Sequence, residues 1–291
     1  MAAPYIGMEN IKNLEPAERF NHLNDYLFYK VMGVKGNEIQ LLGFLNAVLG
    51  RTGKKLIKDV EIQDNNFIAA DMINGKSCFL DIQAILEDGT KVNIEVQLRN
   101  ENNMDRRSLF YWSKLYSESL DKGDNYQELP NVIAINILDF DYPLGGCFHT
   151  CFNLREATEP DLILTPALEI HFINMVKWRR ISDRDLENIP LHRWLTWFDP
   201  KSPLELVEEV ASMDRAIKAA EERRNFVAQS WEERDLYRRR QKAIMDYNSG
   251  MNSARREGKE EGRAEIIALL RQGATLEEIE ERVRLVCGGS W

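Results

Sequence analysis

The stretch DIQAILEDGTKVNIEVQ, residues 81–97, decides the fold. Apolar and polar residues alternate on both sides of Glu87, Asp88 and Gly89, a pattern typical of two antiparallel strands joined by a tight turn. Because side chains alternate between the two faces of a strand, the length of the turn decides which residues share a face.

The position of Gly89 favours one strand register over the other. A two-residue turn would set Asp81 opposite Val96, and the two acidic side chains would then face apart. A three-residue loop with Gly89 in the left-handed conformation pairs Asp81 with Glu95 instead. Only this register separates apolar from polar residues, so we expect one face of the hairpin to carry Asp81, Gln83, Asn93, Glu95 and Gln97.

The residues of this polar face leave two interpretations open. The face can simply be the solvent side of an antiparallel hairpin, which is usually polar. Alternatively, the directly opposed carboxylates of Asp81 and Glu95 need a counter-charge, because like charges across a ladder destabilise a sheet. Mg²⁺ is a suitable counter-ion, since it binds oxygen ligands, commonly one or two carboxylates together with water and phosphate.

Outward from the hairpin, the sequence predicts helices and strands in mixed order. Helical spacing of apolar residues marks 36–50 and 105–123, and Leu109 begins the apolar stripe of the second helix. Strands are expected at 58–63, 130–138, 147–154 and 168–178, and the nearly all-apolar 130–138 indicates a strand buried on both faces. We therefore predict an α/β fold with a mixed sheet flanked by helices.

The character of the chain changes after WFDPKSP, residues 197–203. Residues 204–285 are rich in Glu, Arg, Lys, Ala and Leu and show no strand pattern, so we predict a sheet-containing domain at 1–200 and a helical region at 201–291. A helix break is expected near NSGMNS, residues 248–253. Two short helices are expected around Gly273, with Thr275 and Glu278 forming a capping box for the second.

Composition restricts the protein class and the partners. The 291 residues carry a net charge of -9, and residues 1–200 hold 21 Lys and Arg against 29 Asp and Glu. Nucleic-acid binding must therefore depend on local basic clusters, not on the total charge. The chain has no apolar run long enough to span a membrane and no signal-like start, which predicts a cytoplasmic protein without a membrane partner.

Several motifs, in order, resemble the Rpn family of recombination-promoting nucleases and transposases, within the PD-(D/E)XK nuclease superfamily. The similar segments are LNDYLFYKVMG (23–33), LLGFLNAVLG (41–50), LDIQAILEDGTKVNIEVQ (80–97), the helix and strand that follow, and the tail from Arg255. The resemblance implies a restriction-endonuclease-like core with a helical C-terminal extension. It further implies a DNA endonuclease dependent on Mg²⁺ or Mn²⁺, acting in recombination or transposition-like events.

The resemblance also implies roles for particular residues. Asp81 and Glu95 would be metal ligands, with the backbone carbonyl of Val96 as a third, and Gln97 would orient the attacking water or contact the scissile phosphate. Gln97 replaces the usual Lys, so the metal must supply more of the charge stabilisation. Candidates beyond the hairpin are Asp25 and Glu38 as further acidic site residues, and Lys30, Arg106 and Arg107 as DNA contacts.

Other functions remain open at the level of the sequence. The first alternative is a catalytically inactive DNA- or protein-binding module that retains the nuclease fold, and the second is a nuclease acting on RNA. A homodimer or higher homo-oligomer is expected, because two such sites are needed to cut both strands of a duplex. Cys147, His149 and Cys151 alternate along one predicted strand, but without a fourth ligand they are better read as ordinary strand residues than as a zinc site.

Overall fold

The computed structural model describes residues 20–63, 82–120, 123 and 125–286. Asp81 and the predicted pair Asp81–Glu95 therefore lie outside the described residues. The chain divides into two compact units, Met1–Gln241 and Lys242–Trp291. All of the sheet belongs to the first unit.

The first unit contains a six-stranded mixed sheet with the strand order β1-β2-β3-β4-β6-β5. Strands β3, β4 and β6 run parallel to one another, and the other neighbours are antiparallel. The strands are β1 (Val60–Ile62), β2 (Ile82–Leu86), β3 (Lys91–Gln97), β4 (Val132–Leu138), β5 (His149–Phe152) and β6 (Leu168–Asn174). The predicted α/β class with a mixed sheet is confirmed.

Nine α-helices, together with two 3₁₀ turns, complete the described residues. The helices of the first unit are α2 (Asp25–Met32), α3 (Glu38–Val48), α5 (Met104–Ser117), α6 (Met175–Arg179), α7 (Pro190–Phe198), α8 (Leu204–Met213) and α9 (Arg215–Gln229). The 3₁₀ turns are η2 (Gly53–Lys55) and η3 (Tyr126–Glu128). Helix α10 (Trp231–Arg271) begins in the first unit, and α11 (Leu276–Val286) lies in the second.

The β2–β3 hairpin has the register that the three-residue loop predicts. Ile82 pairs with Ile94 and Gln83 with Asn93, and Gly89 has a φ of 83°. The Gly89 amide donates to the Leu86 carbonyl at 2.9 Å, which closes the turn. A left-handed residue is required at this point of the loop, and glycine adopts that conformation without steric cost.

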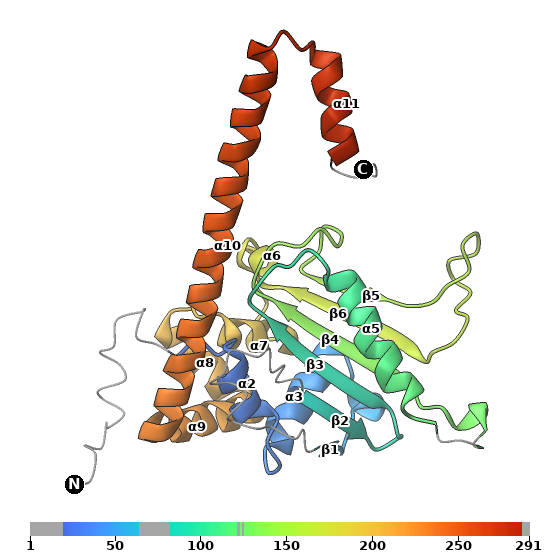
Figure 1. Cartoon of the computed structure of the whole chain (residues 1–291). Helices are drawn as coiled ribbons and strands as arrows, with labels where there is room; N and C mark the ends of the chain where they lie inside the picture. The colour runs from blue at the N-terminus through green and yellow to red at the C-terminus, as the bar shows by residue number, and fades with distance from the viewer. Residues whose placement is uncertain (1–19, 64–81, 121–122, 124, 287–291) are drawn as a thin grey trace. The chain divides into compact units, whose positions relative to one another are not determined.

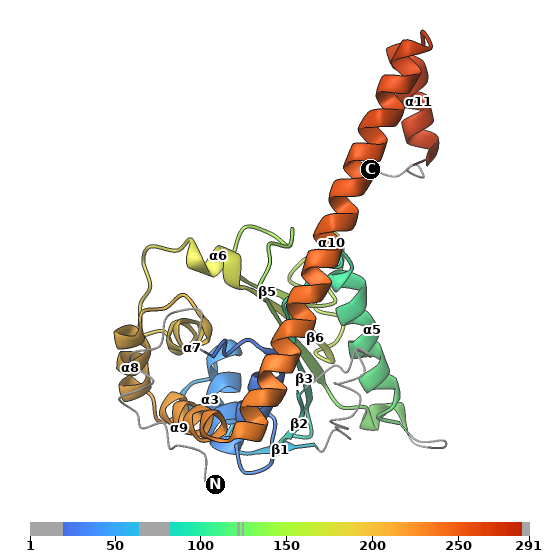
Figure 2. The same cartoon turned by 60° about the vertical axis from the view of Figure 1, so that its left-hand side comes forward.

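Helices cover both faces of the sheet (Figures 1 and 2). Val92, Ile94 and Val96 of β3 join a core shared with α2, α3 and α7, whose large buried side chains include Trp194 and Trp197. The opposite face, which carries Asn93, Glu95 and Gln97, is covered by α5. The polar face of the hairpin is therefore not simply a solvent face.

Helix α5 packs on the sheet through a row that includes Trp112 of the predicted apolar stripe but not Leu109, the first residue of that stripe. Met104 and Ser108 are buried, and Trp112 donates from Nε1 to the Val132 carbonyl at 2.9 Å. Leu109, which the sequence placed on the buried stripe, is 50 % exposed. The reason is that the polar Ser108, not the apolar Leu109, is needed opposite Asn136 of the sheet.

The helices between residues 201 and 241 are integral to the first unit. Helix α9 packs on α2 and α3. Gly43 of α3 lies so close to Ala216 of α9 that a Cβ added to Gly43 would be 2.3 Å from the Cβ of Ala216. The first turns of α10 continue this packing, because Arg240 forms an ion pair with Asp25 and Glu233 one with Lys30. The helical segment 201–241 thus shares its contacts with the N-terminal helices.

In the described part of the second unit, residues 242–286, two helical segments are joined by a turn. Helix α10 runs unbroken through 248–253, so the predicted interruption there is wrong. A helix-interior glycine such as Gly250 costs only about 1 kcal/mol relative to alanine, which is too little to stop the helix. The predicted turn at Gly273 is confirmed, and Thr275 and Glu278 form the predicted reciprocal capping pair. None of the helices described in either unit is long and apolar enough to span a bilayer.

Candidate active site on strand β3

Glu95 is the centre of the polar face. Its side chain is 2 % exposed, and β3 is held in place by the antiparallel β2 on one side and the parallel β4 on the other. Arg107 of α5 donates to Glu95 Oε1 from Nε at 3.0 Å and from Nη2 at 2.5 Å. Gln97 donates to the same oxygen from Nε2. Three donors therefore converge on a single carboxylate oxygen.

The second oxygen of Glu95 has a different environment. Oε2 is buried and has no hydrogen-bond partner among the residues that the structure describes. Burial raises the pKa of Glu95, and the Arg107 guanidinium and Gln97 amide partly oppose that rise. An unpartnered buried oxygen is costly, so its lone pairs are available to a ligand that compensates for the lost hydration.

Two further residues support this arrangement and were not singled out from the sequence. Asn136 of β4 lies beside Glu95 in the parallel register, accepts from the Ser108 hydroxyl at 2.8 Å and donates to the His171 carbonyl at 3.0 Å. The sequence could have pointed to Asn136, because it is the one polar residue in the otherwise apolar strand VIAINIL, residues 132–138. These bonds fix α5 against the sheet, and α5 carries the Arg107 that contacts Glu95.

The structure describes the hairpin residues from Ile82 to Gln97. Glu95 and Gln97 come together on one face, whereas the side chain of Val96 points into the core on the other. Asp81 lies outside the described residues, so its pairing with Glu95 stays a prediction. The register that would bring it there is the observed one for the three pairs from Ile82–Ile94 to Ala84–Val92.

The predicted residues of α2 and α3 have partners of their own. Asp25 accepts from the Arg240 guanidinium, and Lys30 donates to Glu233 at 2.9 Å. Glu38 accepts from the Gly36 amide at 2.9 Å at the start of α3. In the described part of the chain none of the three forms a hydrogen bond or ion pair with Glu95 or Gln97, and their catalytic or DNA-binding roles stay predictions.

The basic residues differ in how accessible they are. Arg106 is exposed at the start of α5, whereas Arg107 is turned inward to Glu95. Arg179 is also engaged, because it bridges Asp139 and Asp199 at 2.5 and 2.9 Å. Arg106 is therefore better placed than Arg107 or Arg179 to meet a phosphate in solution.

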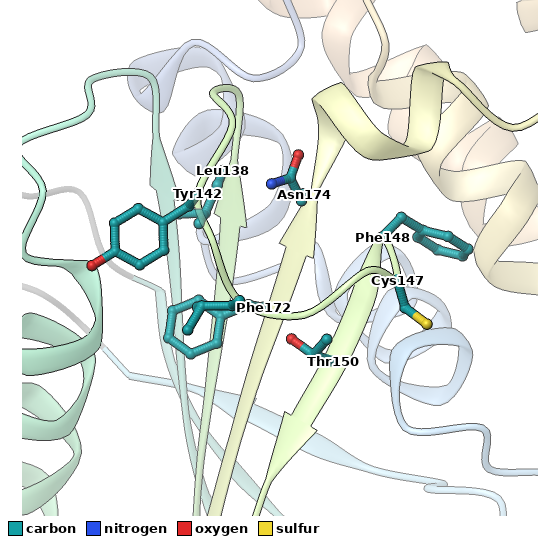
Figure 3. Close-up of a pocket in the computed structure, with 8 residues that line it drawn as sticks. Leu138, Tyr142, Cys147, Phe148, Thr150, Phe172 and Asn174 are labelled. Carbon is teal, nitrogen blue, oxygen red and sulfur yellow. The ribbon is translucent and has the colours of Figure 1, made fainter.

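A small hollow lies beside the carboxyl ends of β4 and β6 (Figure 3). Tyr142, Phe172, Thr150 and Asn174 are among the residues that line it. Its volume of about 10 Å³ admits about one water molecule. A nucleotide cannot enter it, so the hollow is not a substrate site.

The donor set at Glu95 fits a divalent cation in part. A hard cation such as Mg²⁺ takes carboxylate oxygens, and no donor among the described residues competes for Glu95 Oε2. A second protein carboxylate is needed for a convincing site, and Asp81 is the predicted source. The residues therefore fit the cation on the Glu95 side of the site.

Comparison with known proteins gives one match. The family model described as PD-(D/E)XK nuclease family transposase matches residues 22–254, which cover more than half of the chain. The matched range includes the whole sheet, α5 and the helices up to α10. No curated protein and no solved structure matches the chain significantly.

Proposed function

Because the chain belongs to the PD-(D/E)XK nuclease family transposases, we propose that it is a metal-dependent DNA endonuclease whose active site is built on β3. The observation that carries the proposal is the buried Glu95, with Oε1 saturated by three donors and Oε2 left for a cation. Within this family a nuclease-like activity is the expected chemistry. DNA as substrate, Mg²⁺ or Mn²⁺ as cofactor and a part in recombination are the finer points of the proposal.

In this proposal Glu95 and Asp81 hold the cation, with the Val96 carbonyl as a third ligand. Bound Mg²⁺ would lower the pKa of a coordinated water and neutralise charge on the phosphodiester. Gln97 donates an amide N–H to Glu95, so its amide oxygen can accept a hydrogen bond from the attacking water. Arg107 holds the Glu95 carboxylate in a single orientation through two N–H groups.

DNA binding is assigned to the open end of α5. Arg106 is exposed there, one residue before Arg107, and can neutralise a phosphate while Arg107 keeps its ion pair with Glu95. Lys30, Asp25 and Glu38 are given no step in the reaction, because each has a structural partner. Cutting both strands of a duplex requires two sites, so we propose that the chain acts as a homodimer or higher oligomer.

The proposal is tested by plasmid cleavage with the purified full chain and Mg²⁺. Wild type is compared with Asp81→Ala, Glu95→Gln and Glu61→Gln. Glu61 is a matched control, because it is an exposed glutamate on β1 whose register partner Ile85 lies on the same face as Glu95. We expect nicked and linear plasmid from wild type and Glu61→Gln, with a loss of at least a hundredfold in the other two variants.

Chelation of the metal should abolish cleavage by every active form. A wild type that binds but does not cut DNA in Mg²⁺ or Mn²⁺ would replace the nuclease with a non-catalytic binding module of the same fold. Equal cleavage by Glu95→Gln, with its melting temperature unchanged, would remove Glu95 from the active site. Parallel reactions on single-stranded RNA decide whether the substrate is DNA or RNA.

A further inference from the structure

A group of side chains that could hold a metal ion lies at one edge of the sheet, on β5 and β6. Cys151, Glu169 and His171 each direct one ligand atom toward the others, and all three atoms lie within 4.8 Å of one another. Cys151 pairs directly with His171 across the antiparallel ladder, and Glu169 lies two residues before His171 on the same face.

The distances approach those of a tetrahedral site. Cys151 Sγ lies 3.7 Å from His171 Nε2, and Glu169 Oε1 lies 2.7 Å from the same nitrogen. Usual zinc bond lengths in a tetrahedron place sulfur and nitrogen ligands about 3.5 Å apart, and nitrogen and oxygen ligands about 3.3 Å apart. If the partly exposed Glu169 side chain moved about 0.6 Å away from His171, the oxygen–nitrogen distance would match that of two zinc ligands.

His149 supplies the support that a ligating histidine needs. Its Nε2 lies 2.9 Å from His171 Nδ1, and the two rings stack at 5.2 Å. A histidine that binds a metal through Nε2 carries its proton on Nδ1, and it usually donates that proton to a neighbouring acceptor. The His149 ring nitrogen is in the position of that acceptor.

We propose that Cys151, Glu169 and His171 form a binding site for a thiophilic divalent cation of the zinc class, with a fourth position open to water. A thiolate and an imidazole favour zinc or cobalt over Mg²⁺, which prefers oxygen ligands. The site is distinct from Glu95, because His171 aligns with Ile135 of β4 whereas Glu95 aligns with Asn136, so the two side chains leave opposite faces. The cation fastens the edge strand β5 to β6.

The sequence alone favoured ordinary strand residues at Cys147, His149 and Cys151, because it showed only part of this ligand set. Cys147, His149 and Cys151 alternate along the chain, but the structure brings only Cys151 to the ligand group, with His149 behind His171. The other two ligands come from β6, which the sequence spacing did not connect to them. Cys147 instead lines the small hollow shown in Figure 3.

Titration of the chelator-treated full chain with Co²⁺ under reducing conditions tests the site. A thiolate-to-cobalt charge-transfer band in the near ultraviolet reports a sulfur ligand, which the Glu95 site lacks. We expect one equivalent of Co²⁺ to give the band, Zn²⁺ to displace it and Mg²⁺ to leave it unchanged. Cys151→Ser should abolish the band and weaken Zn²⁺ binding at least tenfold.

Cys147→Ser is the matched control, because Cys147 and Cys151 are both exposed free thiols in the same segment. The control should keep the band and the affinity, as should Glu95→Gln. Absence of the band in wild type, its survival in Cys151→Ser or its loss in Cys147→Ser would each overturn the assignment. None of these readouts depends on nuclease activity, so the outcome is separable from that of the plasmid assay.

Discussion

The Glu95–Arg107 pair shows how one residue contact serves both stability and the proposed chemistry. Arg107 is 11 % exposed and Glu95 2 % exposed, so the pair is largely removed from water. Burial of a carboxylate without compensation is unfavourable, and Arg107 opposes the rise in the pKa of Glu95 that burial causes. Sequence reasoning offered both Arg106 and Arg107 as DNA contacts, but the helical turn sends them to different environments, and Arg107 is paired with Glu95.

Arg107→Ala should therefore lower stability, whereas Arg106→Ala should weaken DNA binding and leave stability nearly unchanged. Arg107→Ala leaves Glu95 buried without its charge partner, and we expect a loss of about 3 kcal/mol in the free energy of unfolding. Arg106→Ala should change that free energy by less than about 0.5 kcal/mol, because the side chain is exposed. Urea denaturation measures both values, and binding to a duplex at several salt concentrations measures the phosphate contact.

The two arginines are controls for each other in the binding measurement. Arg106→Ala should lower the slope of affinity against salt by about one counterion. A stable Arg107→Ala would show that the ion pair does not hold Glu95, and an unchanged salt slope in Arg106→Ala would place the DNA elsewhere.

At the scale of elements, local pattern predicted the hairpin, the buried β4 and the capping box well. The hairpin was predictable because side chains alternate between the two faces of a strand and Gly89 adopts the left-handed conformation. Together these two conditions leave one register, the one that puts apolar and polar residues on separate faces. Contacts between distant elements were not predictable from local pattern. The inward turn of Arg107, the burial of Ser108 in place of Leu109, and the meeting of β5 with Glu169 and His171 all depend on packing across the sheet.

The packing of α3 against α9 is a second contact between distant elements, and it depends on a missing side chain. Gly43→Ala would place a new Cβ 2.3 Å from that of Ala216, which is closer than two carbon atoms can approach. Although alanine is the better helix former, we expect the variant to lose about 2 kcal/mol in the free energy of unfolding, because the helices must move apart. Thermal and urea denaturation measure the change.

A compensating substitution makes this test specific. Ala216→Gly removes the opposing Cβ, so the double variant Gly43→Ala with Ala216→Gly should recover most of the loss. Additive losses in the double variant would mean that the close approach is not the cause of the destabilisation.

For the whole molecule, the compact unit extends past the predicted domain boundary near residue 200 to Gln241. The last contacts of this unit come from α10, where Glu233 meets Lys30, Tyr237 accepts from the Asn21 amide and Arg240 meets Asp25. Sequence composition marks where helices replace strands, but it does not show which helices pack back on the sheet domain.

Truncation separates the two units. A chain ending at Gln241 should fold with a melting temperature close to that of the full chain, because it keeps the contacts of α10 with Asn21, Asp25 and Lys30. A chain ending at Ser230 loses them, and we expect its free energy of unfolding to fall by several kcal/mol.

The chain ending at Gln241 also tests the tail, residues 242–291. If the tail mediates the proposed self-association, light scattering should show a smaller assembly for the chain ending at Gln241. A truncated chain of unchanged mass would remove the tail from that role.

Strand β3 lies inside the sheet, with one ladder to β2 and another to β4. Local fraying of a chain releases first the segments that are secured on one side only. The backbone amide of Glu95 can exchange with solvent only after one of these ladders has parted, so its opening belongs to the slowest motions of the protein. The Glu95 part of the proposed site therefore persists while loops and edge strands open locally, and it is lost only when the sheet itself unfolds.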